Sequence, residues 1–348
     1  MTKRKTQGRR GEEVAVEQAE KAGAGPGFRE TEARIVPNWT SYVGAVEGVL
    51  KAAGMCRLDT SRVMGLTQMA FHLIVHEECC PSSVTVYDWC HEHVTALDRL
   101  GVLSEVYQAM PGTATYDAAR RRAVGNIKAS IDRGVGVILW GVDTGEFGVV
   151  HGYDDADGVF LVSGVHGGHD GSNPILYENV GLTFEGAPIL HYQVPLEKVD
   201  YDPAPAYRAS LEYYVKHMES PYHFVPAYKA GLGAYENWIR ALESGRYVPF
   251  GVRYITAVYA CAKQHAADYV RFLAEEWKEL PSLGGAADAF GKVAGVYSRM
   301  RDVLGIEAGG PADLTSPVDP EQAAAMVRLL REARELEART VELVKRAL

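Results

Sequence analysis

The chain lacks any long hydrophobic run. No stretch of its 348 residues approaches the roughly 18 uncharged apolar residues that are needed to span a bilayer. The segment from Met1 to Arg10 is basic and no apolar segment follows it, so we expect no signal peptide. These absences predict a cytoplasmic protein with no membrane partner.

Cysteine and net positive charge are also scarce. The five cysteines are an odd number, which argues against a disulfide framework and favours free thiols. Lys and Arg number 36 against 45 Asp and Glu, so the net charge is −9. Proteins that bind nucleic acid need a clustered basic face, and we therefore expect no nucleic-acid partner. Glutamates directly follow the basic decapeptide, and residues 1–30 are expected to form a mobile, self-neutralising tail.

What the sequence does contain is an alternation of helix and strand patterns up to about residue 200. The stretch 117–133 repeats apolar residues at helical spacing, and Gly134 ends it. The continuous apolar run Val135–Trp140 then predicts a central, buried strand. Gly, Asp and Asn turns separate the further expected strands, at 71–75, 147–151, 159–162, 175–177 and 189–194.

The patterns become helical after a candidate linker, Tyr201-Asp-Pro-Ala-Pro205. We therefore expect an α-helical accessory domain over residues 205–348. The last helix has a well-marked start, because Asp319 can cap it and Pro320 suits its first position. Its apolar residues recur close to every seven positions, which fits packing within its own bundle or a homodimer seam: Met326, Leu329, Ala333, Leu336, Leu343 and Ala347.

Two segments carry the most specific motif. Ser41-Tyr-Val-Gly-Ala-Val-Glu-Gly-Val-Leu-Lys-Ala-Ala-Gly54 reads as a loop that feeds a helix. Glu146-Phe-Gly-Val-Val-His-Gly-Tyr-Asp-Asp155 reads as a strand that an Asp/Gly turn joins to a second strand ending at Ser163. Together they resemble the core of papain-like cysteine hydrolases of the bacteriocin-peptidase and butirosin-acyltransferase kind.

The resemblance implies an α+β papain-like domain, with helices packed on an antiparallel sheet, over residues 31–200. In that family a Cys opens the helix, a His opens the later strand, and an Asp or Asn on the next strand orients the His. The equivalent positions here are Ser41, Glu146 and Ser163. The scaffold is therefore expected to be present, with its catalytic positions substituted.

These substitutions decide the expected function. A serine needs a base in hydrogen-bond contact, and a carboxylate is a weak base at neutral pH. We expect a catalytically degenerate protein that binds a small molecule or peptide in the former cleft and uses no cofactor. Two alternatives stay open: an amide hydrolase or acyltransferase with an atypical nucleophile, and an assembly protein that acts through its helical domain. The simplest role for Ser41 is a helix N-cap. The residues expected at the cleft are Asn38, Trp39, Ser41, Tyr42, Glu146 and Phe147.

Three other histidine patterns need an interpretation. His151 shares a strand with Glu146 but lies five residues on, so side-chain alternation points it to the other face. The glycine-rich stretch 164–173 reads as a connection between strands, with His166 and His169 as candidate rim residues of the cleft. A third group has soft ligands suited to zinc but lacks a Cys-x-x-Cys spacing, so we expect no bound metal there: His72, His76, Cys79, Cys80 and Cys90.

Overall fold

The computed structural model describes residues 27–166, 172–277, 280, 282–307 and 314–348. They form two compact units: Val102–Lys198 with the described residues up to Arg57, and Leu58–Gly101 with Val199–Leu348. The expected domains, 31–200 and 205–348, place residues 58–101 in the first domain, whereas in the structure this segment clusters with the C-terminal helices. Residues 1–26 of the expected tail lie outside the described residues.

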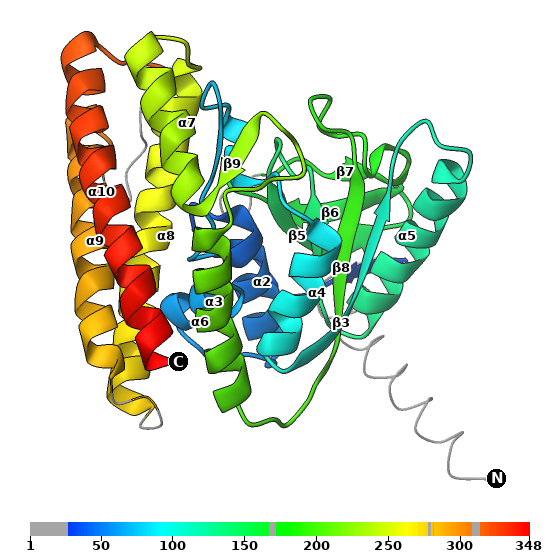
Figure 1. The fold of residues 1–348 in the computed structure, drawn as a ribbon. Coiled ribbons are helices and arrows are strands. Elements are labelled where there is room, and N and C mark those ends of the chain that lie inside the picture. The colour runs from blue at the N-terminus through cyan, green and yellow to red at the C-terminus, as the bar shows by residue number, and fades with distance from the viewer. Residues whose placement is uncertain (1–26, 167–171, 278–279, 281, 308–313) are drawn as a thin grey trace. The chain divides into compact units, whose positions relative to one another are not determined.

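The first unit is built on an antiparallel sheet of seven strands (Figure 1). The strand order is β3-β8-β4-β5-β6-β7, and β1 also pairs with β5. The predicted central strand is β4, which lies between β8 and β5 as expected. The strands are β1 (Phe28–Glu30), β3 (Val102–Ala109), β4 (Val137–Trp140), β5 (Phe147–Asp154), β6 (Val159–Ser163), β7 (Ile175–Leu176) and β8 (Leu190–Lys198).

Two strands of this sheet were not expected. Residues 28–30 form β1 and pair with β5, so this end of the predicted tail belongs to the sheet. β3 pairs with β8 along its whole length and lies at the edge of the sheet. The short 3-10 helix η2 (Tyr177–Asn179) follows β7.

Helices pack on both faces of this sheet. Ala123, Ile127 and Ile131 of α5 (Tyr116–Asp132) share a buried cluster with strand residues such as Val137 and Tyr192. Helix α2 (Ser41–Ala52) packs on β4 and β5. Its Tyr42 bonds to Gln193, the strand residue next to Tyr192, and neighbouring strand residues point to opposite faces. The α+β class, with helices on an antiparallel sheet, therefore follows from the sequence as predicted.

The second unit is mainly helical. Its two strands, β2 (Ile74–His76) and β9 (Tyr228–Ala230), pair antiparallel, and the 3-10 helix η1 (Pro81–Val84) follows β2. The strand expected at 71–75 is thus shifted towards the C-terminus. The α-helices of this unit are α3 (Thr60–Leu66), α4 (Trp89–Arg99), α6 (Ala204–Glu219), α7 (Gly231–Ser244), α8 (Pro249–Glu276), α9 (Leu283–Leu304) and α10 (Pro320–Ala347).

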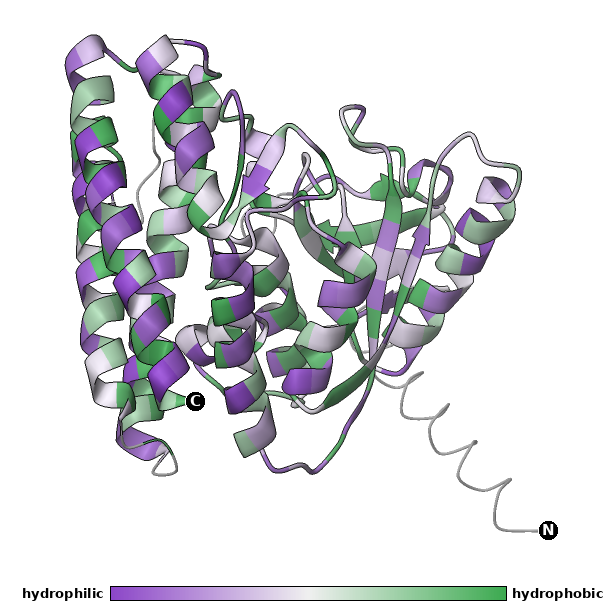
Figure 2. Ribbon diagram, in the orientation of Figure 1, coloured by the Kyte–Doolittle hydropathy of each residue, from purple (hydrophilic) through white to green (hydrophobic). Residues whose placement is uncertain are grey.

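Helix α10 begins as its sequence predicts. The Asp319 side chain accepts a hydrogen bond from the Gln322 amide, Gln322 bonds back, and Pro320 occupies the first turn. Hydrophobic and hydrophilic residues alternate along it (Figure 2), and it packs on α6, α7 and α9. Met326 and Ala333 of the seven-residue pattern are buried within this bundle. No helix in the described part of the chain is long and apolar enough to cross a membrane.

Candidate functional site

The side chains of Ser41 and Glu146 meet, although 105 residues separate them in the chain. Ser41 Oγ donates a hydrogen bond of 2.6 Å to Glu146 Oε2 and accepts one of 3.1 Å from the Phe147 amide. Ser41 is only 4% exposed. It is the first residue of α2, and Thr40 holds the N-cap position without a side-chain cap. The expectation that Ser41 is an N-cap is therefore wrong, because its hydroxyl joins the helix to the start of β5.

Two glycines let α2 approach the segment before it. A Cβ atom added at Gly44 would lie 2.3 Å from the Val36 carbonyl oxygen, and one at Gly48 would lie 1.8 Å from that of Arg34. The Val36 amide also donates to the Gly44 carbonyl at 3.0 Å. Only glycine permits this approach, which fixes the start of the helix against the incoming chain.

Aromatic side chains fill the space beside the pair. The Tyr42 ring meets the Phe147 ring edge-on at 5.4 Å, and its hydroxyl donates to Gln193 Oε1 at 2.8 Å. The Trp140 ring lies 5.0 Å from that of Phe147. These three aromatic residues are buried. Tyr42 and Phe147 therefore belong to the packed core beneath the pair and do not form an open cleft wall.

The remaining expected cleft residues support the chain that enters α2. Asn38 Oδ1 accepts a hydrogen bond of 2.8 Å from the Thr40 amide, which shapes the turn before the helix. Trp39 is half-buried. Ser163 is buried on β6, and its Oγ accepts a hydrogen bond of 3.2 Å from the Ile35 amide. Ser163 thus anchors the segment before the helix.

The other imidazoles on the sheet have partners away from the pair. His151 Nδ1 lies 3.3 Å from Glu30 Oε1 on β1. His191 Nδ1 lies 3.1 Å from Gln108 Oε1, and its ring is edge-on to that of Phe147 at 6.0 Å. Burial lowers the pKa of His191 to about 3, so this imidazole is neutral at physiological pH. Since the Ser41 hydroxyl bonds to Glu146 and Phe147, none of these rings serves as its base in this arrangement.

Only one of the two expected rim histidines can be placed. His166 is exposed in the loop after β6, and its amide donates to Asp143 Oδ2 at 3.3 Å. Asp143 lies in the turn between β4 and Glu146. His169 lies outside the described residues.

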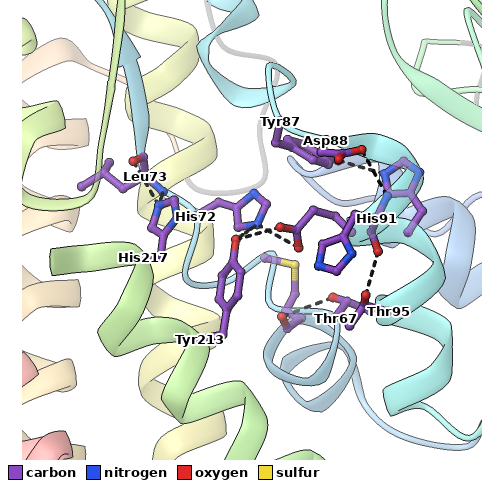
Figure 3. Close-up of polar contacts among 12 residues, drawn as sticks. Thr67, His72, Leu73, Tyr87, Asp88, His91, Thr95, Tyr213 and His217 are labelled. Atoms are coloured by element: carbon purple, nitrogen blue, oxygen red, sulfur yellow. Dashed lines mark hydrogen bonds and ion pairs between the residues drawn. The ribbon is translucent and has the colours of Figure 1, made fainter. Parts of the chain in front are cut away.

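A second polar cluster lies in the helical unit (Figure 3). His72 Nε2 lies 2.6 Å from the Tyr213 hydroxyl, which also donates to Glu92 Oε1 at 3.4 Å. The His72 and His217 rings stack at 5.4 Å, and His217 Nε2 accepts from the Leu73 amide at 2.9 Å. Burial holds the pKa of His72 well below its usual value and raises that of Glu92. Burial therefore favours the neutral forms of both His72 and Glu92 in this cluster.

The candidate zinc ligands do not come together. Burial raises the pKa of the Cys79 thiol well above its usual range, and that of exposed Cys90 is raised by burial and by Asp88. Cys80 Sγ accepts a hydrogen bond from Ser82 Oγ, and the His76 ring packs on Tyr228. Within the described ranges, no three His, Cys, Asp or Glu side chains gather as a metal site would require.

Comparison with models of known protein families gave no match to this chain, and comparison with curated proteins gave none either. The site must therefore be interpreted from its own residues.

Sequence reasoning missed several of these residues. Gln193 supports Tyr42, and Tyr213 and His217 complete the cluster around His72. One signal was available, because Tyr213 and His217 lie four residues apart in a helix and so share a face. Their contacts with His72 span more than 140 positions, and no local pattern encodes them.

Proposed function

We propose that this protein binds a small molecule or a peptide with a papain-like first unit whose hydrolytic site is disarmed. The observation that carries the proposal is the hydrogen bond from Ser41 Oγ to Glu146 Oε2, together with the bond from the Phe147 amide to the same Oγ. These two bonds engage the hydroxyl as donor and as acceptor.

The chemistry of the pair supports a role without turnover. Acyl transfer needs a base that removes the proton from the nucleophile. It also needs an acid that gives a proton to the leaving group. A carboxylate accepts a proton poorly at neutral pH, and loss of general acid–base help typically lowers the rate 10²- to 10⁴-fold. Ser41 and Glu146 then serve to hold α2 on the sheet.

We infer from the resemblance that the ligand lies beside the half-buried residues of the former site. Trp39 and Glu146 are half-buried, whereas Tyr42 and Phe147 are buried. We propose that a ligand contacts the Trp39 side of the pair, where a half-buried aromatic ring offers a packing surface.

Covalent probes test the loss of catalysis. We expect a fluorophosphonate that reacts with activated serines to leave Ser41 unmodified, as read by peptide mass mapping. Glu146→Gln is the matched variant, because it keeps the shape of the side chain but removes its charge, and it should be equally unreactive. Stoichiometric modification of Ser41 in the unaltered protein, abolished by Ser41→Ala, would instead establish a working nucleophile.

A further inference from the structure

A polar surface pocket of about 460 Å³ lies in the first unit, close in sequence to Glu146. The described residues that line it come from the turn after β4, from β7, from η2 and from four further positions: His166, Asn173, Pro174 and Thr183. This volume falls in the range of small-molecule sites. Its polar lining consists of Asp143, Thr144, His166, Asn173, Asn179 and Thr183.

The turn that carries Asp143 is held in an uncommon conformation. Asp143 has φ +66°, in the left-handed region, and its Oδ2 accepts hydrogen bonds from the His166 amide and from Ser172 Oγ at 3.0 Å. A Cβ atom at Gly164 would lie 2.2 Å from this Oδ2. Glycine at 164 therefore makes room for the carboxylate, and the surrounding bonds fix a backbone that would otherwise be unfavourable.

A second glycine makes room for Thr183 at the pocket. Gly141 has φ +83°, and a Cβ atom there would lie 2.6 Å from Thr183 Oγ1. The carboxylate of Asp143 and the hydroxyl of Thr183 thus line one pocket because two glycines leave space for them. The pocket is fixed by contacts within its own unit.

The chemistry of the lining narrows the class of ligand. No Lys or Arg is among the described residues that line the pocket, and the Asp143 carboxylate lies in its lining, so the pocket disfavours a phosphate or carboxylate ligand. Carboxylate, amide and hydroxyl groups are complementary to adjacent ligand hydroxyls, since they supply both donors and acceptors. Two exposed side chains, Pro174 and Leu176, offer apolar surface for the C–H face of a ring.

We infer that this pocket binds a neutral saccharide, with Asp143 and Asn179 as hydrogen-bonding partners of its hydroxyls. The inference rests on the proposed function, because it gives the disarmed protein a ligand. It uses a different set of residues from the Ser41–Glu146 pair, so the two can fail separately.

Saturation-transfer NMR on the full chain tests the inference. The probes are methyl α-glucoside, methyl β-galactoside, methyl α-mannoside and N-acetylglucosamine, with glucose 6-phosphate and mannose 6-phosphate as anionic counterparts. We expect transfer to at least one neutral probe and weaker transfer to the phosphates. Asp143→Asn keeps a residue that tolerates the left-handed turn, and Asn179→Leu removes the amide. Each should weaken binding at least tenfold at an unchanged melting temperature.

Asp98→Asn is the matched control, because it makes the same chemical change at an exposed position of the helical unit. It should bind like the unaltered protein. Three results would overturn the inference: no transfer to any neutral saccharide, binding that survives both pocket variants, or tighter binding of the sugar phosphates. Probe labelling of Ser41 together with intact saccharide binding would refute the disarmed site while leaving this pocket in place.

Discussion

Lys263 Nζ lies 2.5 Å from Glu337 Oε1, and both side chains are almost completely buried in the helical unit. The Tyr214 hydroxyl donates to the other carboxylate oxygen at 2.6 Å. The Tyr297 ring lies 6.0 Å from Lys263 Nζ, and its hydroxyl pairs with that of Tyr235 at 2.8 Å. Helices α6 to α10 each contribute one of these residues, so a single polar network joins the five helices.

This network predicts an asymmetric response to substitution. Glu337→Leu leaves a buried ammonium without its counter-charge and should lower the free energy of unfolding by about 3–5 kcal/mol. Lys263→Met combined with Glu337→Leu removes both charges and should recover most of that loss. Urea unfolding followed by circular dichroism measures both. The exposed pair Arg331–Glu243 is the control, since Arg331→Ala should change stability by about 1 kcal/mol or less. A single variant as stable as the parent would contradict the prediction.

Glycine positions in two helices predict opposite effects of the same substitution. Gly48→Ala puts a methyl group against the Arg34 carbonyl and should destabilise the first unit by more than about 2 kcal/mol, although alanine favours helix. Gly125 of α5 has no atom within 4 Å of the added Cβ, and Gly125→Ala should stabilise by about 1 kcal/mol. Thermal melts of the two variants give the signs directly, and equal signs would refute the packing argument.

The stacked His72 and His217 rings predict a loss of stability at mildly acidic pH. Burial lowers the pKa of His217 to about 4, against about 6.5 in an unfolded chain. The unfolded chain therefore binds more protons than the folded one between pH 6.5 and 4, and the free energy of unfolding falls as pH drops through this window. His217 should account for about 1–2 kcal/mol of this loss between pH 7 and 5, and His72, whose pKa burial also lowers, acts in the same direction.

His217→Gln separates this effect from other groups, because it removes the titration and keeps an oxygen that can accept from the Leu73 amide. Glu92, whose pKa burial raises, acts in the opposite direction and is common to both proteins. Urea unfolding at pH 7 and at pH 5 should show a smaller loss in the variant. An equal loss in both proteins would rule out His217 as its source.

The Ser41 hydroxyl predicts a larger effect on stability than a helix cap would have. Ser41→Ala removes a hydrogen bond to a carboxylate and leaves the Phe147 amide without this partner, so we expect a loss of about 2–4 kcal/mol. Thr40→Ala is the neighbouring control, because Thr40 makes no side-chain cap bond and its loss should cost about 0.5 kcal/mol or less. Denaturant unfolding of both variants measures the contrast. A similar small change in each would mean that the hydroxyl does not join helix and strand.

Installing the Cys and His of papain-like hydrolases at positions 41 and 146 should create a reactive thiol. In Ser41→Cys with Glu146→His, the helix N-terminus and the imidazole both favour the thiolate, so iodoacetamide should modify residue 41 near neutral pH. Ser41→Cys alone should react slowly, because the carboxylate of Glu146 disfavours a thiolate. Peptide mapping against pH gives each rate, with exposed Cys90 as an internal reference. Equal rates in the single and double variants would show that the pair does not occupy a papain-like geometry.

Local features of the fold could be predicted from the sequence, because they depend on neighbouring residues. Asp319 accepts a hydrogen bond at the start of α10, where a short polar side chain satisfies a free amide. The apolar run at 135–140 is confirmed as an inner strand, since β4 lies between β8 and β5. The sequence could predict this because a strand that is covered on both faces is typically apolar along its length.

Features that depend on distant residues were harder to predict. β3 lies at the sheet edge, and most of its residues are exposed or half-buried. Its sequence therefore shows only a weak alternation of apolar and polar residues. The stacking of His72 on His217 depends on how α6 packs, and periodicity within one helix does not specify its partner. The meeting of Ser41 and Glu146 could be anticipated only from the resemblance, which aligns these two positions with the Cys and His of a catalytic pair.

The connectivity of the two units limits how the gene can be divided. The chain passes between them after Arg57, Gly101 and Lys198, and β2 in the first half of the sequence pairs with β9 in the second. A stop codon at the Tyr201–Pro205 linker would leave residues 58–101 without the helices with which they cluster. A fragment that starts there would in turn lack α3, α4 and the partner strand of β9. Expression of either unit alone therefore calls for a rearranged gene. For the first unit, a short loop would replace residues 58–101, and for the second unit, residues 58–101 would be fused to 199–348.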